Sequence, residues 1–115
     1  MGQFSVASHF DGKDPATRQI YDRLLQRSGK LGPVTEDPKK TSIHLVNNTA
    51  FAGVATRKTA VILTIKSDRR LDSPRIHKSE QTSTNRYHHE VRLTSPADVD
   101  AELTGWLKAA YELSA

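Results

Sequence analysis

The segment from His77 to Arg92 carries the residues best suited to chemistry in this chain of 115 residues. It holds three of the five histidines, together with a glutamate two residues after His88. Histidine exchanges protons near neutral pH and a carboxylate can orient it, so His88 and Glu90 form a candidate acid–base pair. With His77 or His44 from a neighbouring strand, they would also supply two imidazoles and a carboxylate for zinc or iron.

Neither of these chemistries is accompanied by a recognisable motif. The sequence lacks a zincin helix, a Gly-x-Ser-x-Gly elbow, a Ser-x-x-Lys motif and a glycine-rich phosphate loop. It also has no cysteine, which excludes disulfides, thiolate metal sites and a cysteine nucleophile. We therefore expect no metal and no cofactor, and we expect binding rather than catalysis, with a small enzyme using His88 and Glu90 as the alternative.

The uneven distribution of charge points to a second kind of chemistry, the binding of anions. Residues 39–92 carry eleven Lys and Arg against four Asp and Glu, a net charge of +7, whereas residues 93–115 carry one against four. Such a surface attracts phosphate and other anions, although an ordinary solvated face has the same composition. The candidate ligand-binding residues, with Lys78 beside them, are Lys39, Lys40, Arg75, His77, Arg86, His88 and Arg92.

Several partners are compatible with this basic surface. Cations on a sheet face with an aromatic side chain nearby are typical of single-strand nucleic-acid binding, although Tyr87 is the single Phe, Tyr or Trp of residues 77–92. Another anionic ligand or a protein partner would use the same face, and a dimerising structural protein is a further alternative. The sequence identifies no ligand and no oligomeric state.

A helix is predicted near the start of the chain. Asp14 is a preferred N-cap residue and Pro15 suits the first helical position. Apolar residues then recur at helical spacing, up to a stop at Gly29 or Gly32: Ala16, Ile20, Tyr21, Leu24 and Leu25. Residues 1–13 show no sustained period, so we expect a flexible lead-in, with Phe4, Val6 and Phe10 as its points of contact, followed by one domain from 14 to 115.

The middle of the chain changes to a period of two residues, which predicts strands. Three strand-like segments follow one another as a meander, at 41–46, 49–56 and 59–66. Asn47-Asn48 favours a two-residue turn between the first two, because asparagine tolerates positive φ. Residues 86–93 alternate as a further strand, residues 32–40 resemble a connection, and residues 75–81 fit either a short strand or a loop.

A second helix is predicted at the C-terminus. Ser95-Pro96-Ala97-Asp98 has the form of a capping box with proline just inside the helix. One continuous apolar stripe follows, made by Val99, Leu103, Trp106, Ala110 and Leu113. Because this stripe must be covered, we expect an α+β fold with both helices packed on one face of a mainly antiparallel sheet of four to five strands.

Three groups of residues carry a resemblance to a known family. They are Lys39-Lys40-Thr41-Ser42-Ile43-His44-Leu45, Asp72-Ser73-Pro74-Arg75, and Val91-Arg92-Leu93 followed by Asp98-Val99-Asp100, Trp106-Leu107 and Ala109-Ala110-Tyr111. From about Phe10 to its end, the chain resembles a bacterial family catalogued as domain of unknown function 5655. The resemblance implies an α+β fold and a surface shared by Lys40, Arg75, Arg86 and the His88 region, and it implies no established reaction.

The sequence also supports an expectation about location. The longest apolar run, residues 60–65, is far shorter than the roughly 20 residues that a membrane span requires. The N-terminus lacks a basic region followed by an apolar one, as a signal peptide would have. We therefore expect a cytoplasmic protein without membrane association.

Overall fold

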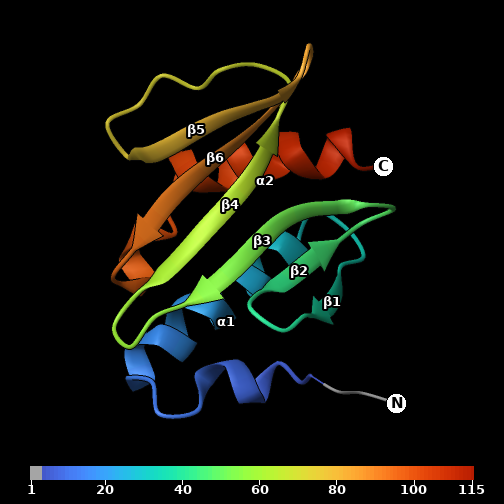
Figure 1. Cartoon of the computed structure of the whole chain (residues 1–115). Coiled ribbons are helices and arrows are strands. Elements are labelled where there is room, and N and C mark those ends of the chain that lie inside the picture. The colour runs from blue at the N-terminus through green and yellow to red at the C-terminus, as the bar shows by residue number, and fades with distance from the viewer. Residues whose placement is uncertain (1–3) are drawn as a thin grey trace.

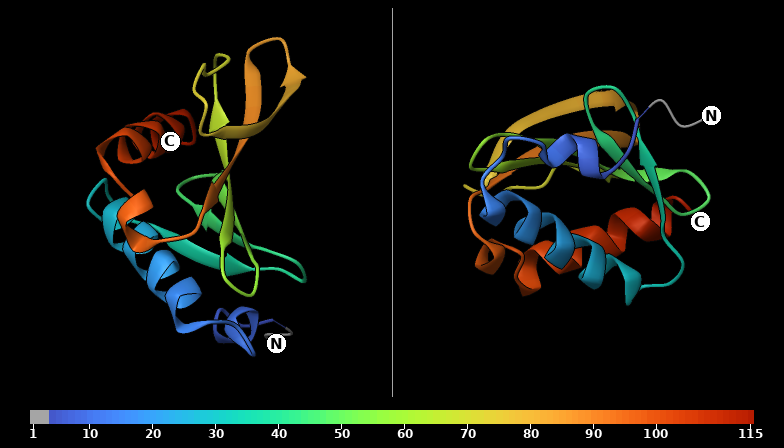
Figure 2. Two further views of the ribbon diagram at one scale, coloured as in Figure 1. Left: turned by 90° about the vertical axis from the view of Figure 1, so that its left-hand side faces the viewer. Right: turned by 90° about the horizontal axis from the view of Figure 1, so that it is seen from below.

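The computed structural model describes residues 4–115 and shows a six-stranded antiparallel sheet with both long helices on one face (Figure 1; Figure 2). The strands lie in the order β1-β2-β3-β4-β6-β5. Their bounds are β1 Thr35–Pro38, β2 Ile43–Val46, β3 Ala50–Thr56, β4 Val61–Ser67, β5 Ile76–Ser83 and β6 Arg86–Leu93. The predicted α+β class and central meander are confirmed, while the sheet has six strands instead of four to five.

The first helix begins where the sequence predicted. In α1, Pro15–Gly29, the side chain of Asp14 accepts a hydrogen bond from the Ala16 amide at 3.0 Å. The buried side of α1 includes Ile20, Tyr21 and Leu24, none of which is exposed. A preferred N-cap and an apolar stripe at helical spacing therefore account for both the start of this helix and its orientation.

The prediction of a plain connection at residues 32–40 is wrong, because this segment contains β1. The strand pairs with β2 from Thr35 opposite Val46 to Pro38 opposite Ile43. The hydroxyl of Tyr21 on α1 donates to Glu36 Oε2 at 2.5 Å, and burial together with this bond raises the pKa of Tyr21 above its usual value. A short edge strand with half-buried or exposed side chains has no apolar alternation, so no sequence pattern indicates it.

The link between β2 and β3 differs from the predicted two-residue turn. It spans residues 47–49, and no described residue other than glycine has a positive φ. The amides of Asn48 and Thr49 donate to the Ser114 carbonyl at 2.9 and 3.1 Å, and Asn47 Nδ2 donates to the Tyr111 carbonyl at 3.2 Å. These bonds satisfy carbonyls that the C-terminus of a helix would otherwise leave unpaired.

The predicted C-terminal helix is split into a short 3-10 helix and a separate α-helix. The capping box of Ser95 and Asp98 is present, but it opens a short 3-10 helix, η2 Pro96–Asp98, that ends at Val99. A second N-cap, Asp100, then starts α2, Ala101–Leu113, by accepting from the Leu103 amide at 3.1 Å. Of the predicted apolar stripe, Val99, Leu103 and Ala110 are fully buried, whereas Trp106 and Leu113 are only partly buried; Leu107, beside the stripe, is also fully buried.

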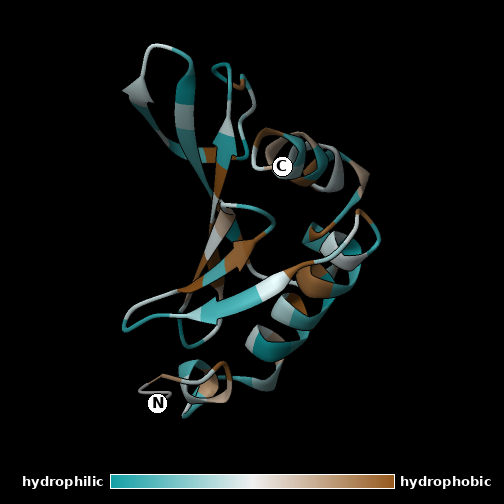
Figure 3. Ribbon diagram, turned by 90° about the vertical axis from the view of Figure 1, so that its right-hand side faces the viewer, coloured by the Kyte–Doolittle hydropathy of each residue, from teal (hydrophilic) through white to brown (hydrophobic). Residues whose placement is uncertain are grey.

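The segment whose structure the sequence left open forms strand β5, which makes a hairpin with β6. Of its eight residues, Ile76 is partly buried and the other seven are exposed. The hairpin is correspondingly hydrophilic, whereas apolar residues gather in the central strands and in the helix surfaces that face them (Figure 3). One hydrophobic cluster lies between the sheet and the helices.

The predicted lead-in is partly packed on the domain. Residues 7–10 form the 3-10 helix η1, Ala7–Phe10, and Val6 and Phe10 pack against the core, whereas Phe4 is 44 % exposed. Residues 1–3 of the lead-in lie outside the described residues. No helix of the described chain is long and apolar enough to cross a membrane.

Candidate ligand site on the open sheet face

The two faces of the sheet have different surroundings. In β4, Val61, Leu63 and Ile65 are buried toward the helices, whereas Ile62, Thr64 and Lys66 are only half-buried on the opposite side. Figure 1 looks onto this second face, and within residues 4–115 neither long helix covers it. We call it the open face, and it is the place where side chains of the sheet remain accessible to a ligand.

Strand register places the residues of the open face in rows. The central row crosses all six strands and consists of Asp37, His44, Gly53, Thr64, Glu90 and Lys78. The row nearer the tip of the β5–β6 hairpin contains Lys66, His88 and Glu80, and the row on the other side contains Ala55, Ile62 and Arg92. Basic and acidic residues are therefore interspersed among uncharged ones on this face.

A groove of about 280 Å³ lies in the middle of the open face. Its floor is β3, where the side chains of Ala50 and Ala55 are small and Gly53 has none. A Cβ atom on Gly53 would lie 3.9 Å from His44 Cδ2 and 4.0 Å from Thr64 Cβ, which are ordinary contacts. The polar groups around this groove come from Ser42, His44, Thr64, Lys66 and His88.

A β-bulge in β3 shapes one end of the groove. Leu45 pairs with Ala52 and Val46 pairs with Ala50, which leaves Phe51 as the extra residue. Phe51 is buried on the helix side, where its ring packs edge-on against Tyr111 with centroids 5.3 Å apart. A bulge bends its strand, and Figure 1 shows β3 diverging from β4 toward the C-terminal end of β4.

Besides the uncharged Ser42 and Thr64, the sequence analysis missed one charged groove residue, Lys66. Its ammonium donates to Ser114 Oγ at 2.8 Å and to Thr49 Oγ1 at 3.2 Å, so the C-terminus of α2 holds it in place. Burial, and secondly the nearby Arg86, lower the pKa of Lys66 below its usual value. An ammonium has three donor hydrogens, and these two bonds leave one for a ligand.

The structure brings together only some of the predicted ligand-binding residues. Arg86, His88 and Arg92 share the open face of β6. Lys39 and Lys40 follow β1 near the opposite edge of the sheet, where Lys39 pairs with Asp37 at 3.0 Å, and His77 lies in a bulge of β5. The predicted residues therefore line no single surface.

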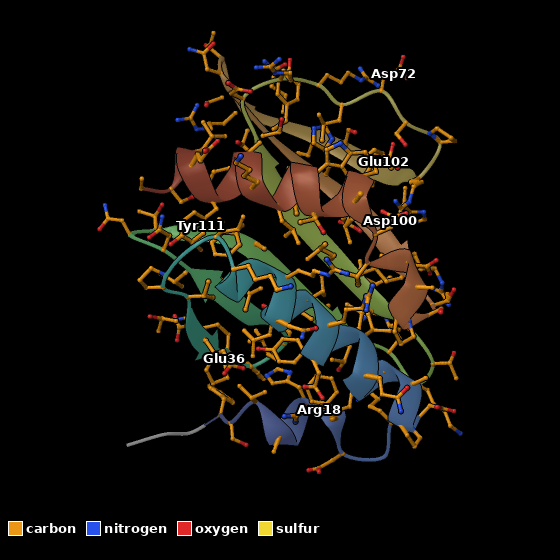
Figure 4. The ribbon with its side chains drawn as sticks, turned by 180° about the vertical axis from the view of Figure 1, so that it is seen from behind. Arg18, Glu36, Asp72, Asp100, Glu102 and Tyr111 are labelled. Atoms are coloured by element: carbon orange, nitrogen blue, oxygen red, sulfur yellow. The ribbon has the colours of Figure 1, made fainter. Side chains whose placement is uncertain are left out.

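Arg75 lies on the helix side of the sheet, away from the open face. Its guanidinium donates to both Asp100 oxygens at 2.9 and 3.1 Å, to Glu102 Oε1 at 3.0 Å and to the Asp98 carbonyl at 2.6 Å. It also lies 5.8 Å from the centre of the Trp106 ring. Asp100 and Glu102 are labelled at the start of α2 in Figure 4. In this position Arg75 joins the loop before β5 to the N-terminus of α2.

The Arg75→Met variant should separate a structural role from a ligand-binding role. Methionine keeps an apolar contact with Trp106 but removes the bonds to Asp98, Asp100 and Glu102, so we expect the melting temperature at pH 7 to fall by about 5 °C. Trp106 is the only tryptophan, and its fluorescence can follow unfolding. Arg69→Met is the matched control, because Arg69 is 76 % exposed and, among residues 4–115, its side chain pairs only with Asp68.

The effect of Arg75→Met should also depend on pH. The Leu103 amide, and then Arg75, lower the pKa of Asp100. A lowered folded-state pKa means that ionised Asp100 adds stability above its unfolded-state value of about 3.9, and that this stability is lost as the pH falls through the folded value. The two melting temperatures should therefore converge in acid, and a constant difference down to acidic pH would contradict this pairing.

The alternative acid–base pair, His88 and Glu90, lies on the open face, with His88 at the groove. His88 is exposed and Glu90 half-buried on the open face, and β4 places Lys66 opposite His88 and Thr64 opposite Glu90. The next residue, His89, is fully buried on the helix side. In the described chain, no three histidine or acidic side chains are placed to hold a metal ion.

Together these features define a small α+β domain with one face covered by helices and one open, grooved face. The chain belongs to the family described as Domain of unknown function (DUF5655), whose sequence model matches residues 6–114. This match confirms the resemblance noted in the sequence. Among curated proteins and solved structures, none matches the chain.

Proposed function

We propose that this domain is a binding module that takes a small organic anion in the groove over Gly53. The observation that carries the proposal is the composition of the groove: its polar side chains are Ser42, His44, Thr64, Lys66 and His88. All of them can donate hydrogen bonds, and none is acidic. A phosphate or carboxylate group in the groove would meet donors on both sides.

The charges outside the groove favour a small anion over a long polyanion. Arg86, Arg92 and Lys78 on the open face alternate with Asp37, Glu80 and Glu90. A nucleic-acid backbone crossing the sheet would meet these carboxylates at close intervals, which weakens its electrostatic attraction. The groove of about 280 Å³ is slightly smaller than typical small-molecule sites, which measure roughly 300–1,000 Å³.

Lys66 is the cation best placed to attract the ligand. Two hydroxyl partners fix its ammonium, so little side-chain freedom is lost when an anion binds. Its lowered pKa reflects burial and the like charge of Arg86, and an anion beside it would favour the charged form. A hydrogen bond to a charged group is worth about 1.5–3 kcal/mol, enough to dominate the affinity of a small ligand.

The test is calorimetric titration of the domain with adenosine 5′-monophosphate, adenosine and inorganic phosphate. We expect the monophosphate to bind more tightly than adenosine, and Lys66→Met to weaken its binding by about tenfold or more. Lys108→Met removes the same charge from the exposed side of α2 and should bind as the wild type does. Lys66→Arg should recover part of the affinity.

Two results would contradict the proposal. Equal affinity for adenosine and its monophosphate, or no binding of any of the three probes, would exclude an anion site in the groove. Binding of single-stranded DNA that tightens steeply as salt is lowered, without a contribution from Lys66, would instead favour a nucleic-acid surface on Arg86 and Arg92. Thermal melting of each variant shows whether a loss of binding reflects a loss of folding.

A further inference from the structure

The two edges of the sheet are protected to different degrees. At one edge, β1 has four residues and ends in Pro38, which has no amide hydrogen to donate. At the other edge, β5 has eight residues, contains no proline and is exposed at seven of them. Within the described chain, the backbone bonds of β5 are those to β6, together with one from the Ile76 amide to the Ser73 carbonyl. The outer edge of β5 is therefore available for another strand.

The charges along β5 are complementary to themselves. Bulges interrupt its pairing with β6 on both sides of residues 78–81, so the regular part of the strand centres near Ser79 and Glu80. If two copies pair antiparallel about Ser79, Lys78 of each copy lies opposite Glu80 of the other. Both side chains lie on the open face, opposite Glu90 and His88 of β6. Protected edges usually carry charges that repel a second copy, whereas this arrangement attracts one.

We propose that β5 pairs with β5 of a second copy of this chain, so that the two sheets join edge to edge. The contact is isologous, because each copy gives the other the same pair of residues, and it closes after two copies. The two-fold axis passes through the sheet near Ser79, which leaves both open faces on the same side. The dimer therefore presents both grooves on the same side, separated by β4, β6 and β5 of each copy, and its formation does not depend on the ligand proposed for them.

The experiment is sedimentation velocity over a concentration series with two charge-reversed variants. The wild type should dimerise, whereas Lys78→Glu and Glu80→Lys should each raise the dissociation constant about tenfold or more, because each places like charges opposite one another twice. The Lys78→Glu chain carries glutamate at residues 78 and 80, and the Glu80→Lys chain carries lysine at both. When the two variants are mixed, each glutamate of one chain lies opposite a lysine of the other. The mixture should therefore form a heterodimer.

The mixing experiment also separates pairing from folding. Any effect of a variant within its own chain, such as Lys78→Glu beside Glu90, is the same before and after mixing, so it cannot restore association. A wild type that stays monomeric at high concentration would overturn the proposal. It would also be overturned by single variants that dimerise as the wild type does, or by a mixture that stays monomeric.

Discussion

Replacing His89 with alanine should cost about 3 kcal/mol of the free energy of unfolding, through the loss of a buried hydrogen-bonding group. The imidazole is fully buried. Its Nδ1 atom lies 2.8 Å from Ser79 Oγ, and its Nε2 atom lies 3.3 Å from the Leu71 amide and 3.2 Å from the Arg69 carbonyl. The ring also stacks on Tyr87, with centroids 5.9 Å apart. His89 thus ties the loop after β4 to the β5–β6 hairpin.

Urea denaturation would measure the loss of stability, and limited trypsin digestion would locate it. Without His89 the backbone of residues 69–71 loses its partner on β6, so we expect rapid cleavage after Arg69 and Arg70. His88→Ala is the matched control, since His88 is exposed on the open face of the same strand, and its stability should stay close to that of the wild type. Equal stability of the two variants, with no new cleavage, would exclude this anchoring role.

The contrast between His88 and His89 shows what strand periodicity can and cannot predict. The alternation of residues 86–93 implies that neighbours such as His88 and His89 lie on opposite faces of a strand, and the structure agrees. Periodicity could not reveal the partners of His89, because Arg69 and Leu71 belong to a loop without a period. It also could not reveal β1, whose side chains do not alternate and whose Glu36 accepts a hydrogen bond from Tyr21 on a separate segment, α1.

The sequence predicted those residues of the candidate site that lie on a single strand, β6. Arg86, His88 and Arg92 follow from the alternation of β6. Lys66 and Gly53 join them through the register of three strands and the bulge at Phe51, neither of which local sequence determines. The positive charge of Arg75 suggested that it belongs to an anion-binding surface. Its partners in the structure are instead carboxylates at the start of α2, which local sequence does not indicate.

The groove itself is best tested by filling it with the Gly53→Val variant. A Cβ atom fits at this position, the φ of Gly53 is not positive, and a β-branched residue suits a strand, so we expect the fold to be retained. The added methyl groups would occupy the space between His44 and Thr64, and binding of adenosine 5′-monophosphate should weaken by about tenfold or more.

Two further glycine variants make this result interpretable. Gly53→Ala adds one carbon atom at ordinary contact distance, so its loss of affinity should be smaller than that of valine. Gly105→Ala adds a methyl group on α2 that, apart from its chain neighbours and the helix backbone, has no heavy atom within 4 Å, so it should stabilise the helix without changing the affinity. If Gly53→Val binds the monophosphate as the wild type does, any anion site lies elsewhere on the open face. If affinity falls in the order glycine, alanine, valine while stability is kept, the ligand occupies the space over Gly53.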